Sequence, residues 1–336
     1  MPAEINHSAK FYDVFNGDAD GICALHQLRL VQHRNAELIT GAKRDIDLLS
    51  RFESQTGDCL TVLDISLDSN IAALRKHLAA GAEITYFDHH NAALAFEHEN
   101  LHLHCDMAAD VCSSILVNRY LRGQHWQWAV VAAYGDNLPV VATAMASQAG
   151  LKELQRKQLQ ELGTLLNYNA YGESVDDLHF HPAALYEAVH EYADPFEFFN
   201  NAGQFDFLCS AYANDMAFMQ GLRAYSQSAS TSVYILPPQA WARRVSGILA
   251  NQLTQDQPGK SFAVLTAKPD ASYVVSVRSG NAERYPASEF CAVFATGGGR
   301  RGAGGINNLP ESEVDSFVQA FIAYFEKMEK PQLSLP

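Results

Sequence analysis

Four short acidic clusters in the first half of the chain hold residue types that bind divalent cations. They are Asn16-Gly17-Asp18-Ala19-Asp20-Gly21, Leu63-Asp64-Ile65-Ser66, Phe87-Asp88-His89-His90 and Tyr134-Gly135-Asp136-Asn137. Carboxylate oxygens suit hard cations, and an imidazole extends the choice to softer ones. Asp18 and Asp20 can address two neighbouring ions from one turn, and Asp64 can bridge them. Two ions about 3.5–4 Å apart would generate a bridging hydroxide and neutralise a phosphoryl group during in-line displacement.

Each cluster also has an ordinary structural interpretation. A D-x-D turn such as the one at Asp18 is usually a helix cap or a solvated loop, and Asp64 alone could cap a helix. A His-His pair is more often on the surface than bound to a metal. The metal interpretation is favoured because all four clusters follow apolar runs of strand length.

These apolar runs predict strands that bring the clusters together. They are residues 11–15, 59–63, 83–87 and 128–133. Between them, segments 22–31 and 70–80 have helical spacing, and strands that alternate with helices predict a doubly wound parallel sheet. Ligands of such sheets gather at the carboxyl ends of the strands, which is where the clusters lie.

The rest of the chain predicts a helical segment followed by a second α/β domain. The pattern is mainly helical from about 138 to 225, most clearly in 152–166 and 182–192. A new alternation follows, with strands at 232–236, 261–265 and 273–277 and helices at 239–253 and 312–328.

The predicted fold is therefore α/β with two domains, because 336 residues exceed the size at which a single core stops growing. We expect a metal-binding domain with the doubly wound parallel sheet at 1–195, a helical connector at 196–228 and a smaller α/β substrate-binding domain at 229–336. The active site is expected in the cleft between the two domains.

A glycine-rich segment, 297–305, is the candidate phosphate grip. It satisfies the G-x-G-x-x-G pattern, but the strand, helix and later acidic residue of a dinucleotide site are missing. The better interpretation is a loop whose backbone N–H groups approach an anion, with Arg300 and Arg301 adding forked hydrogen bonds. A flexible surface hairpin is the alternative.

The charge distribution fits an enzyme for a small phosphorylated substrate. The net charge of −14 argues against a long basic track for duplex DNA. Segment 231–310 nevertheless carries eight basic and four acidic residues, so it has a net charge of +4 and the rest of the chain −18. An acidic part that could hold cations is thus joined to a basic part that could hold an anion, although chance asymmetry of solvated faces is an alternative.

The remaining composition predicts a cytoplasmic protein with reduced thiols. The six cysteines form no C-x-x-C pair, no apolar run approaches the length of a membrane span, and residues 1–7 do not resemble a secretion signal. His98, His102, His104 and Cys105 would suit zinc, but the alternation at 101–104 is typical of a strand with one exposed face.

The clusters resemble the DHH phosphoesterases, to which Asp88-His89-His90 is a literal match, and the order and spacing of the motifs also fit. The resemblance continues through Ala109-Asp110-Val111-Cys112-Ser113-Ser114, similar to the small-residue helix start of that family, and through Tyr134-Gly135-Asp136. In the second half, Val274 to Ser279 and Gly297 to Gly305 look like the partner domain called DHHA1. Nearly the whole chain is covered.

The resemblance implies roles for individual residues. Its metal ligands would be Asn16, Asp18, Asp20, Asp64, His89 and Asp136, with Asp64 bridging and acting in catalysis with Asp88 and His90, which orient ligands or touch the phosphate. Its substrate-binding residues would be Ser113, Arg278, Gly298, Gly299, Arg300 and Arg301. The implied cofactor is Mn²⁺, two ions per active site, with Mg²⁺ or Co²⁺ as substitutes.

Two positions depart from the family pattern. Asn16 stands where members commonly carry His or Asp, and a neutral amide oxygen is a weaker ligand, so one metal is expected to bind loosely. Arg300 follows three glycines where His is usual, and this replaces a titratable imidazole with a permanent charge.

The leading hypothesis is a phosphodiesterase that hydrolyses short linear nucleotides, such as dinucleotides, to mononucleotides, similar to the short-oligonucleotide branch of the family. The alternative on the same fold is a nucleoside bisphosphate phosphatase or a pyro- or polyphosphatase. A nucleotide site needs a stacking aromatic ring, for which Tyr273, Tyr285 and Phe294 are candidates. A non-catalytic nucleotide sensor is less favoured, no long duplex or membrane partner is expected, and a homodimer is one option for assembly.

Overall fold

The computed structural model describes residues 9–92, 97–268 and 270–326. The chain divides into two compact units, Met1–Tyr212 and Ala213–Pro336, and the division falls inside helix α9 (Gly203–Gln220). Each unit has its own sheet, so the α/β fold class predicted from the sequence is confirmed.

The sheet of the first unit is parallel throughout, with the order β2-β1-β3-β4-β5. Its strands are β1 (Phe11–Asn16), β2 (Glu37–Gly41), β3 (Cys59–Leu63), β4 (Glu83–Asp88) and β5 (Leu101–Cys105). β5 is the alternating strand expected there. The apolar runs predicted β1, β3 and β4 but not the edge strand β2.

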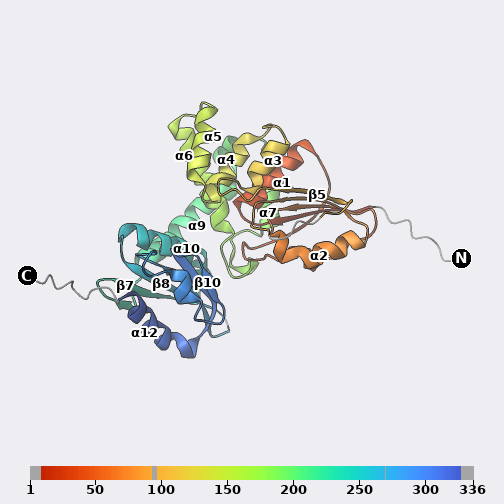
Figure 1. Cartoon of the computed structure of the whole chain (residues 1–336). Helices are drawn as coiled ribbons and strands as arrows, with labels where there is room; N and C mark the ends of the chain where they lie inside the picture. Colours follow the sequence, from red (N-terminus) through yellow and green to blue (C-terminus); the bar gives the residue numbers. More distant parts are fainter. Residues whose placement is uncertain (1–8, 93–96, 269, 327–336) are drawn as a thin grey trace, which may run out of the picture. The chain divides into compact units, whose positions relative to one another are not determined.

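Helices cover both faces of this sheet (Figure 1). The nearby helices are α1 (Ala19–Val31), α2 (Leu67–Ala79), α3 (Ser113–Tyr120) and α7 (Pro182–His190). Alternate strand residues, such as Tyr12, Leu60 and Ile84, pack with Leu74 and Leu78 of α2. Residues of the opposite parity face α1, as expected for strands buried on both sides.

The run 128–133, predicted as a strand, is helical instead. It forms the middle of α4 (Trp126–Gly135), and all six of its side chains are buried. Helix α4 is surrounded by α1, α3, α5 (Pro139–Gln148) and α6 (Glu153–Asn169). A helix buried on every side has no polar face, so its sequence lacks the periodicity that separates a helix from a buried strand.

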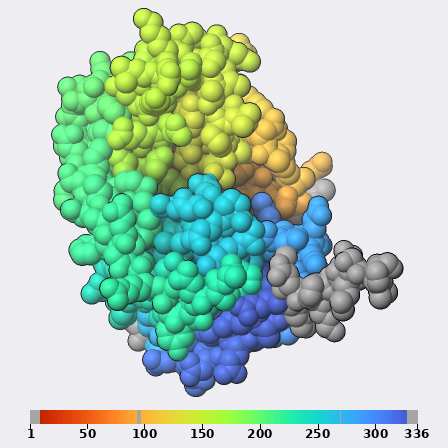
Figure 2. All heavy atoms as spheres, turned by 90° about the vertical axis from the view of Figure 1, so that its left-hand side faces the viewer, coloured from red at the N-terminus to blue at the C-terminus, as the bar shows by residue number. Residues whose placement is uncertain are grey.

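Helices complete the first unit. α8 (Pro195–Asn201) and the first part of α9 follow α7, so the segment predicted as mainly helical is helical. The α5–α6 pair forms part of the surface seen in Figure 2, and Val140 and Leu154 are among its exposed apolar side chains.

The second unit contains a mixed six-stranded sheet with the order β10-β11-β9-β8-β7-β6. Its strands are β6 (Ser226–Gln227), β7 (Thr231–Leu236), β8 (Ser261–Ala267), β9 (Ser272–Arg278), β10 (Gly297–Gly299) and β11 (Ala303–Pro310), and its helices are α10 (Ala240–Asp256), α11 (Ala287–Cys291) and α12 (Val314–Phe325). The predicted strands and helices correspond to β7, β8, β9, α10 and α12, whereas β6, β10, β11 and α11 were not predicted. Residues 327 and 328 of the predicted closing helix lie outside the described residues.

The glycine-rich segment, predicted as a loop with a surface hairpin as the alternative, is a β-hairpin. β10 pairs antiparallel with β11, Gly298 opposite Gly305, and residues 300–302 form the connection. Glycine-rich sequence hides a strand because it lacks the β-branched and aromatic residues that mark one. We call residues 297–305 the arginine hairpin, because Arg300 and Arg301 stand at its tip.

Two expectations from composition can be compared with the structure. All six cysteines are free thiols. Among the described residues, no helix has both the length and the apolar character needed to cross a membrane.

Candidate active site

The turn from β1 into α1 positions the first two carboxylates. Asp18 caps α1, because its Oδ1 accepts hydrogen bonds from the N–H groups of Asp20 (3.0 Å) and Gly21 (3.1 Å). A Cβ on Gly21 would lie 2.1 Å from the carbonyl oxygen of Asn16, so a larger residue would force the turn open. The Asn16 amide oxygen accepts from the Asp18 N–H at 3.2 Å.

The N-terminus of α3 fixes the Asp20 carboxylate. The N–H groups of Ser113 and Ser114 each donate to one of its oxygens at 2.7 Å, and the Asp20 side chain is fully buried. The Ser113 hydroxyl donates to Asp64 Oδ1 at 3.1 Å. Ser113 is itself fully buried, so it orients two carboxylates in this structure, and the geometry does not support its predicted contact with substrate.

Asp64 follows β3 with a strained backbone. Its φ of 58° lies in the left-handed region that non-glycine residues rarely adopt, and its N–H donates to the Phe87 carbonyl oxygen at 3.0 Å. Such strain is typical of positions that the surrounding structure holds for a functional reason.

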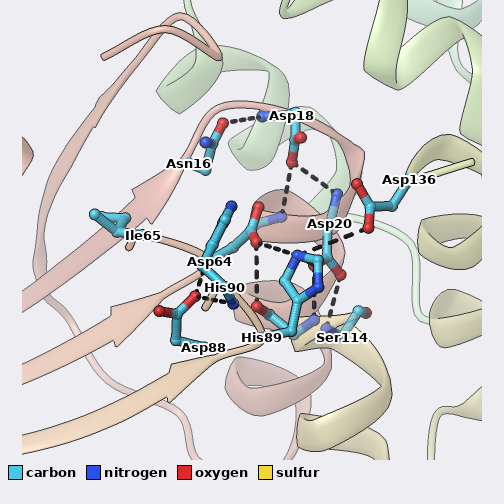
Figure 3. A network of polar contacts seen from close by, with 12 residues as sticks. Asn16, Asp18, Asp20, Asp64, Ile65, Asp88, His89, His90, Ser114 and Asp136 are labelled. Atoms are coloured by element: carbon cyan, nitrogen blue, oxygen red, sulfur yellow. Dashed lines mark hydrogen bonds and ion pairs between the residues drawn. The ribbon is translucent and has the colours of Figure 1, made fainter. Parts of the chain in front are cut away.

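Three carboxylates from distant segments meet around the His89 ring (Figure 3). His89 Nε2 lies 3.4 Å from Asp64 Oδ1, 3.7 Å from Asp136 Oδ2 and 3.9 Å from Asp20 Oδ2. We call these four residues the carboxylate site. Asp136 reaches it from the C-terminal end of α4, not from the end of a strand.

Asp88 of the DHH triplet makes hydrogen bonds in two directions, one toward α2 and one toward His90. Asp88 Oδ2 accepts from the Leu67 N–H at 3.0 Å, and its Oδ1 accepts from His90 Nδ1 at 2.7 Å. Asp88 therefore joins the end of β4 to α2 and leaves Nε2 of His90 for a ligand. The hydrogen bond that His90 donates to Asp88 also raises the pKa of His90.

The buried, mutually repelling carboxylates of the carboxylate site favour the binding of a cation. Burial raises the pKa of Asp64 well above its usual range, and repulsion from Asp20 and Asp18 adds to the shift. The same causes, in the same order, raise the pKa of Asp136 to about 7. Carboxylates crowded in this way are stabilised by positive charge.

The donor set fits a divalent cation. Asp64, His89 and His90 can bring ligand atoms within 4.8 Å of one another, and Asp20, His89 and Asp136 form a second such group. Mixed carboxylate and imidazole ligands suit manganese better than calcium. Asp18 is in neither group. Burial alone would raise its pKa, but the charge and hydrogen bond of Lys43, together with the backbone hydrogen bond from Gly21, lower it overall.

Lys43 is the residue that sequence reasoning missed. It follows β2, and its Nζ lies 2.5 Å from Asp18 Oδ2 and 3.9 Å from Asp136 Oδ1. Asn167, 3.4 Å from the same nitrogen, and the ring of Tyr171 complete its surroundings. Lys43 was missed because β2 was not predicted. A parallel strand beside β1 places its carboxyl end at the same edge of the sheet as the acidic clusters.

In the second unit, the predicted phosphate-binding residues gather at one end of the sheet. Arg278, at the end of β9, pairs with Ala303 of β11, directly after the tip of the arginine hairpin. The Arg278 Nε donates to Asn251 at 3.0 Å, and an Arg301 NH group donates to the Glu283 carbonyl oxygen at 2.6 Å. Arg300 is exposed, and its guanidinium has no partner within the part of the chain that the structure describes.

The glycines of the hairpin differ from each other. A Cβ on Gly298 would meet nothing within 4 Å, so its backbone is open to a ligand. Gly299 has a φ of 136°, and a Cβ there would lie 2.6 Å from the Ala303 carbonyl oxygen. Gly298 could therefore contact a phosphate, whereas Gly299 is required by the turn.

The aromatic candidates for base stacking fit less well. Tyr285 is only 9% exposed and belongs to the core of the second unit, and Phe294 packs against that core. Tyr273 is the second residue of β9, five residues before Arg278, and strand geometry separates the two by about 17 Å. The rings of Tyr285 and Phe294 are therefore used in the core of the second unit, and Tyr273 lies at the other end of β9 from Arg278.

Comparison with solved structures identifies the fold. An exonuclease RecJ bound to manganese matches with a TM-score of 0.64 at 15% identity, over 97% of this chain and 92% of RecJ. The chain therefore shares the two-domain α/β fold of that structure.

Two further solved structures share this fold. A pGpG-specific phosphodiesterase, PggH from Vibrio cholerae, matches with a TM-score of 0.59 at 13% identity over 95% of this chain and 100% of PggH. CDC45 from Entamoeba histolytica matches with a TM-score of 0.51 at 7% identity over 95% of both chains. No family model and no curated protein matches the sequence.

Proposed function

We propose that this chain is a cytoplasmic, divalent-metal-dependent phosphodiesterase that hydrolyses short linear nucleotides, such as dinucleotides, to mononucleotides. The observation that carries the proposal is the carboxylate site, where three carboxylates lie 3.4–3.9 Å from one imidazole nitrogen. The shared fold with RecJ and with PggH supports it, because both names describe enzymes that cleave phosphodiester bonds.

Asp20, Asp64, His89 and Asp136 would hold the cation, with Mn²⁺ preferred and Mg²⁺ or Co²⁺ as substitutes. Such a cation, when bound, lowers the pKa of water and neutralises phosphoryl charge. Ser113 and Ser114 would keep Asp20 from turning away. Asp88 would orient His90 toward the scissile phosphate, which makes Asp88 a positioning residue.

The arginine hairpin would bind the terminal phosphate of the substrate. Arg300 is free to form a bidentate contact, the absence of a side chain at Gly298 leaves room for a ligand to approach the backbone, and Arg278 lies at the same end of the sheet. Recognition of a terminal phosphate would limit the enzyme to short substrates.

The test is conversion of 5′-phosphorylated dinucleotides to mononucleotides, followed by chromatography with and without Mn²⁺. The dinucleotide pGpG belongs in the panel because PggH is named for it. Cyclic dinucleotides, a nucleoside bisphosphate, pyrophosphate and longer single strands complete the set. Turnover of pyrophosphate or the bisphosphate without turnover of dinucleotides would contradict the proposal, and so would activity that survives Asp64→Asn.

A further inference from the structure

Lys43 occupies a position beside the carboxylate site that a cation would otherwise take. Its ammonium contacts Asp18 at 2.5 Å and approaches Asp136 at 3.9 Å. The Lys43 N–H donates to the Ala170 carbonyl oxygen at 3.0 Å, so the backbone is anchored at the end of α6. The side chain is only 32% exposed, which indicates a built contact and not a surface encounter.

The ligands expected for a second metal ion are already committed to the chain. Asp18 uses Oδ1 to cap α1 and Oδ2 to accept from Lys43. The amide oxygen of Asn16 accepts from the backbone of Asp18. Asp18 belongs to neither of the two groups of converging donors, which are Asp64 with His89 and His90, and Asp20 with His89 and Asp136.

The charges agree with this division. Three carboxylates and an imidazole surround one position, which suits a divalent ion. The other position offers Asp18, one oxygen of Asp136 (a residue that also belongs to the carboxylate site), a neutral amide and a fixed ammonium. A divalent ion entering there would have to displace Lys43 and would gain few ligands in return.

We propose that Lys43 replaces the second divalent cation, so that the chain binds one ion per active site among Asp20, Asp64, His89 and Asp136. The inference rests on the proposed function, because it assumes that these residues bind a divalent ion. The ammonium neutralises Asp18 and presents N–H donors to a phosphoryl oxygen. Asn16 fits this arrangement, because a site without a second ion does not need an anionic or imidazole ligand at position 16.

The experiment counts Mn²⁺ ions bound to the full chain by titration calorimetry and records the electron paramagnetic resonance spectrum of the loaded protein. Wild type is expected to bind one ion and give a mononuclear spectrum. The double variant Asn16→Asp/Lys43→Gln is expected to bind two ions and give an exchange-coupled spectrum. Lys43→Arg keeps the charge and should bind one ion, as should the matched control Lys157→Gln, whose lysine pairs with Glu153 on an exposed helix face.

Two ions with a coupled spectrum in wild type would overturn this inference and leave the proposed function intact. One ion in the folded double variant would also overturn it, because removing Lys43 would then not create a second site. No ion in wild type would overturn the proposed function itself, and the inference with it. If circular dichroism shows that the double variant does not fold, the wild-type stoichiometry and spectrum decide the question alone.

Discussion

The carboxylate site and the arginine hairpin differ in how firmly the chain holds their charged groups. Asp20 is fully buried and accepts two backbone N–H groups at 2.7 Å, and Asp64 is held by Ser113 and by a strained backbone. Arg300, in contrast, is exposed at the tip of a two-stranded hairpin, with no partner among the described residues.

The difference follows from what each charge has to do. Carboxylates that repel one another stay together only if the fold supplies compensating N–H donors before any cation binds. An arginine that meets a mobile phosphate needs reach and a forked shape more than a fixed position. The predictions below test this contrast between a preorganised site and an adaptable one.

The largest effect is expected for Asp64→Asn in the carboxylate site. Turnover of a dinucleotide should fall on the order of 10³-fold or more, because Asp64 holds the cation in the proposed function. The metal-free variant should melt at the same or a higher temperature than wild type, since one of several repelling carboxylates is gone. Steady-state kinetics and calorimetry measure the two effects. A large loss of stability would instead mean that Asp64 is mainly structural.

The stability of the first unit, which contains the carboxylate site, should also depend on the buried ion pair between Arg29 and Asp13. The Arg29 guanidinium donates to Asp13 on β1 and to Thr61 on β3, and both charged side chains are 2% exposed. Arg29→Met should lower the free energy of unfolding by about 3–5 kcal/mol, because it leaves Asp13 buried without a partner. Denaturant unfolding measures this change. The double variant Asp13→Leu/Arg29→Met should lose less, and an equal loss would contradict the explanation.

A smaller effect is expected for a change in the arginine hairpin. Arg300→Ala should raise KM for a 5′-phosphorylated dinucleotide about 10–100-fold, which corresponds to the loss of one charged hydrogen-bonding group, with little change in kcat. Arg284→Ala is the control, because that guanidinium lies over the Tyr285 ring. Equal KM values for the Arg300 variant and wild type would remove the hairpin from the substrate site.

The smallest effect is the pH dependence of stability that arises from His26, a buried residue of α1. Burial lowers the pKa of His26 to about 3, with the neighbouring His190 adding to the shift. Below the unfolded value of 6.5 only the unfolded chain takes up the proton, so stability is lost as pH falls from 6.5 toward 3. The free energy of unfolding should decrease by about 1 kcal/mol from pH 7.5 to 5.5 through this group.

Denaturant titrations of wild type and His26→Gln at both pH values measure that contribution as a difference. The variant should show the weaker pH dependence, whatever its absolute stability. An unchanged pH dependence would mean that His26 is already protonated in the folded protein.

Much of the fold was accessible from the sequence because strand and helix periods are local properties. The apolar runs at β1, β3 and β4, each ending in acidic residues, were enough to predict a parallel sheet and one shared edge. The same reasoning failed at α4 and at the arginine hairpin. A fully buried helix loses its polar face, and a glycine-rich strand has no side-chain pattern to recognise.

By itself, the sequence determined which chemistry was available: several carboxylates and imidazoles near strand ends, and arginines among glycines. Only the tertiary structure decided how these groups divide, with Asp20, Asp64 and Asp136 around His89, Asp88 turned toward α2, and Asp18 paired with Lys43. The physical reason is that a side chain's partners are set by which elements pack together. The Lys43 contact depends on the short edge strand β2, whose place in the sheet no local pattern reveals.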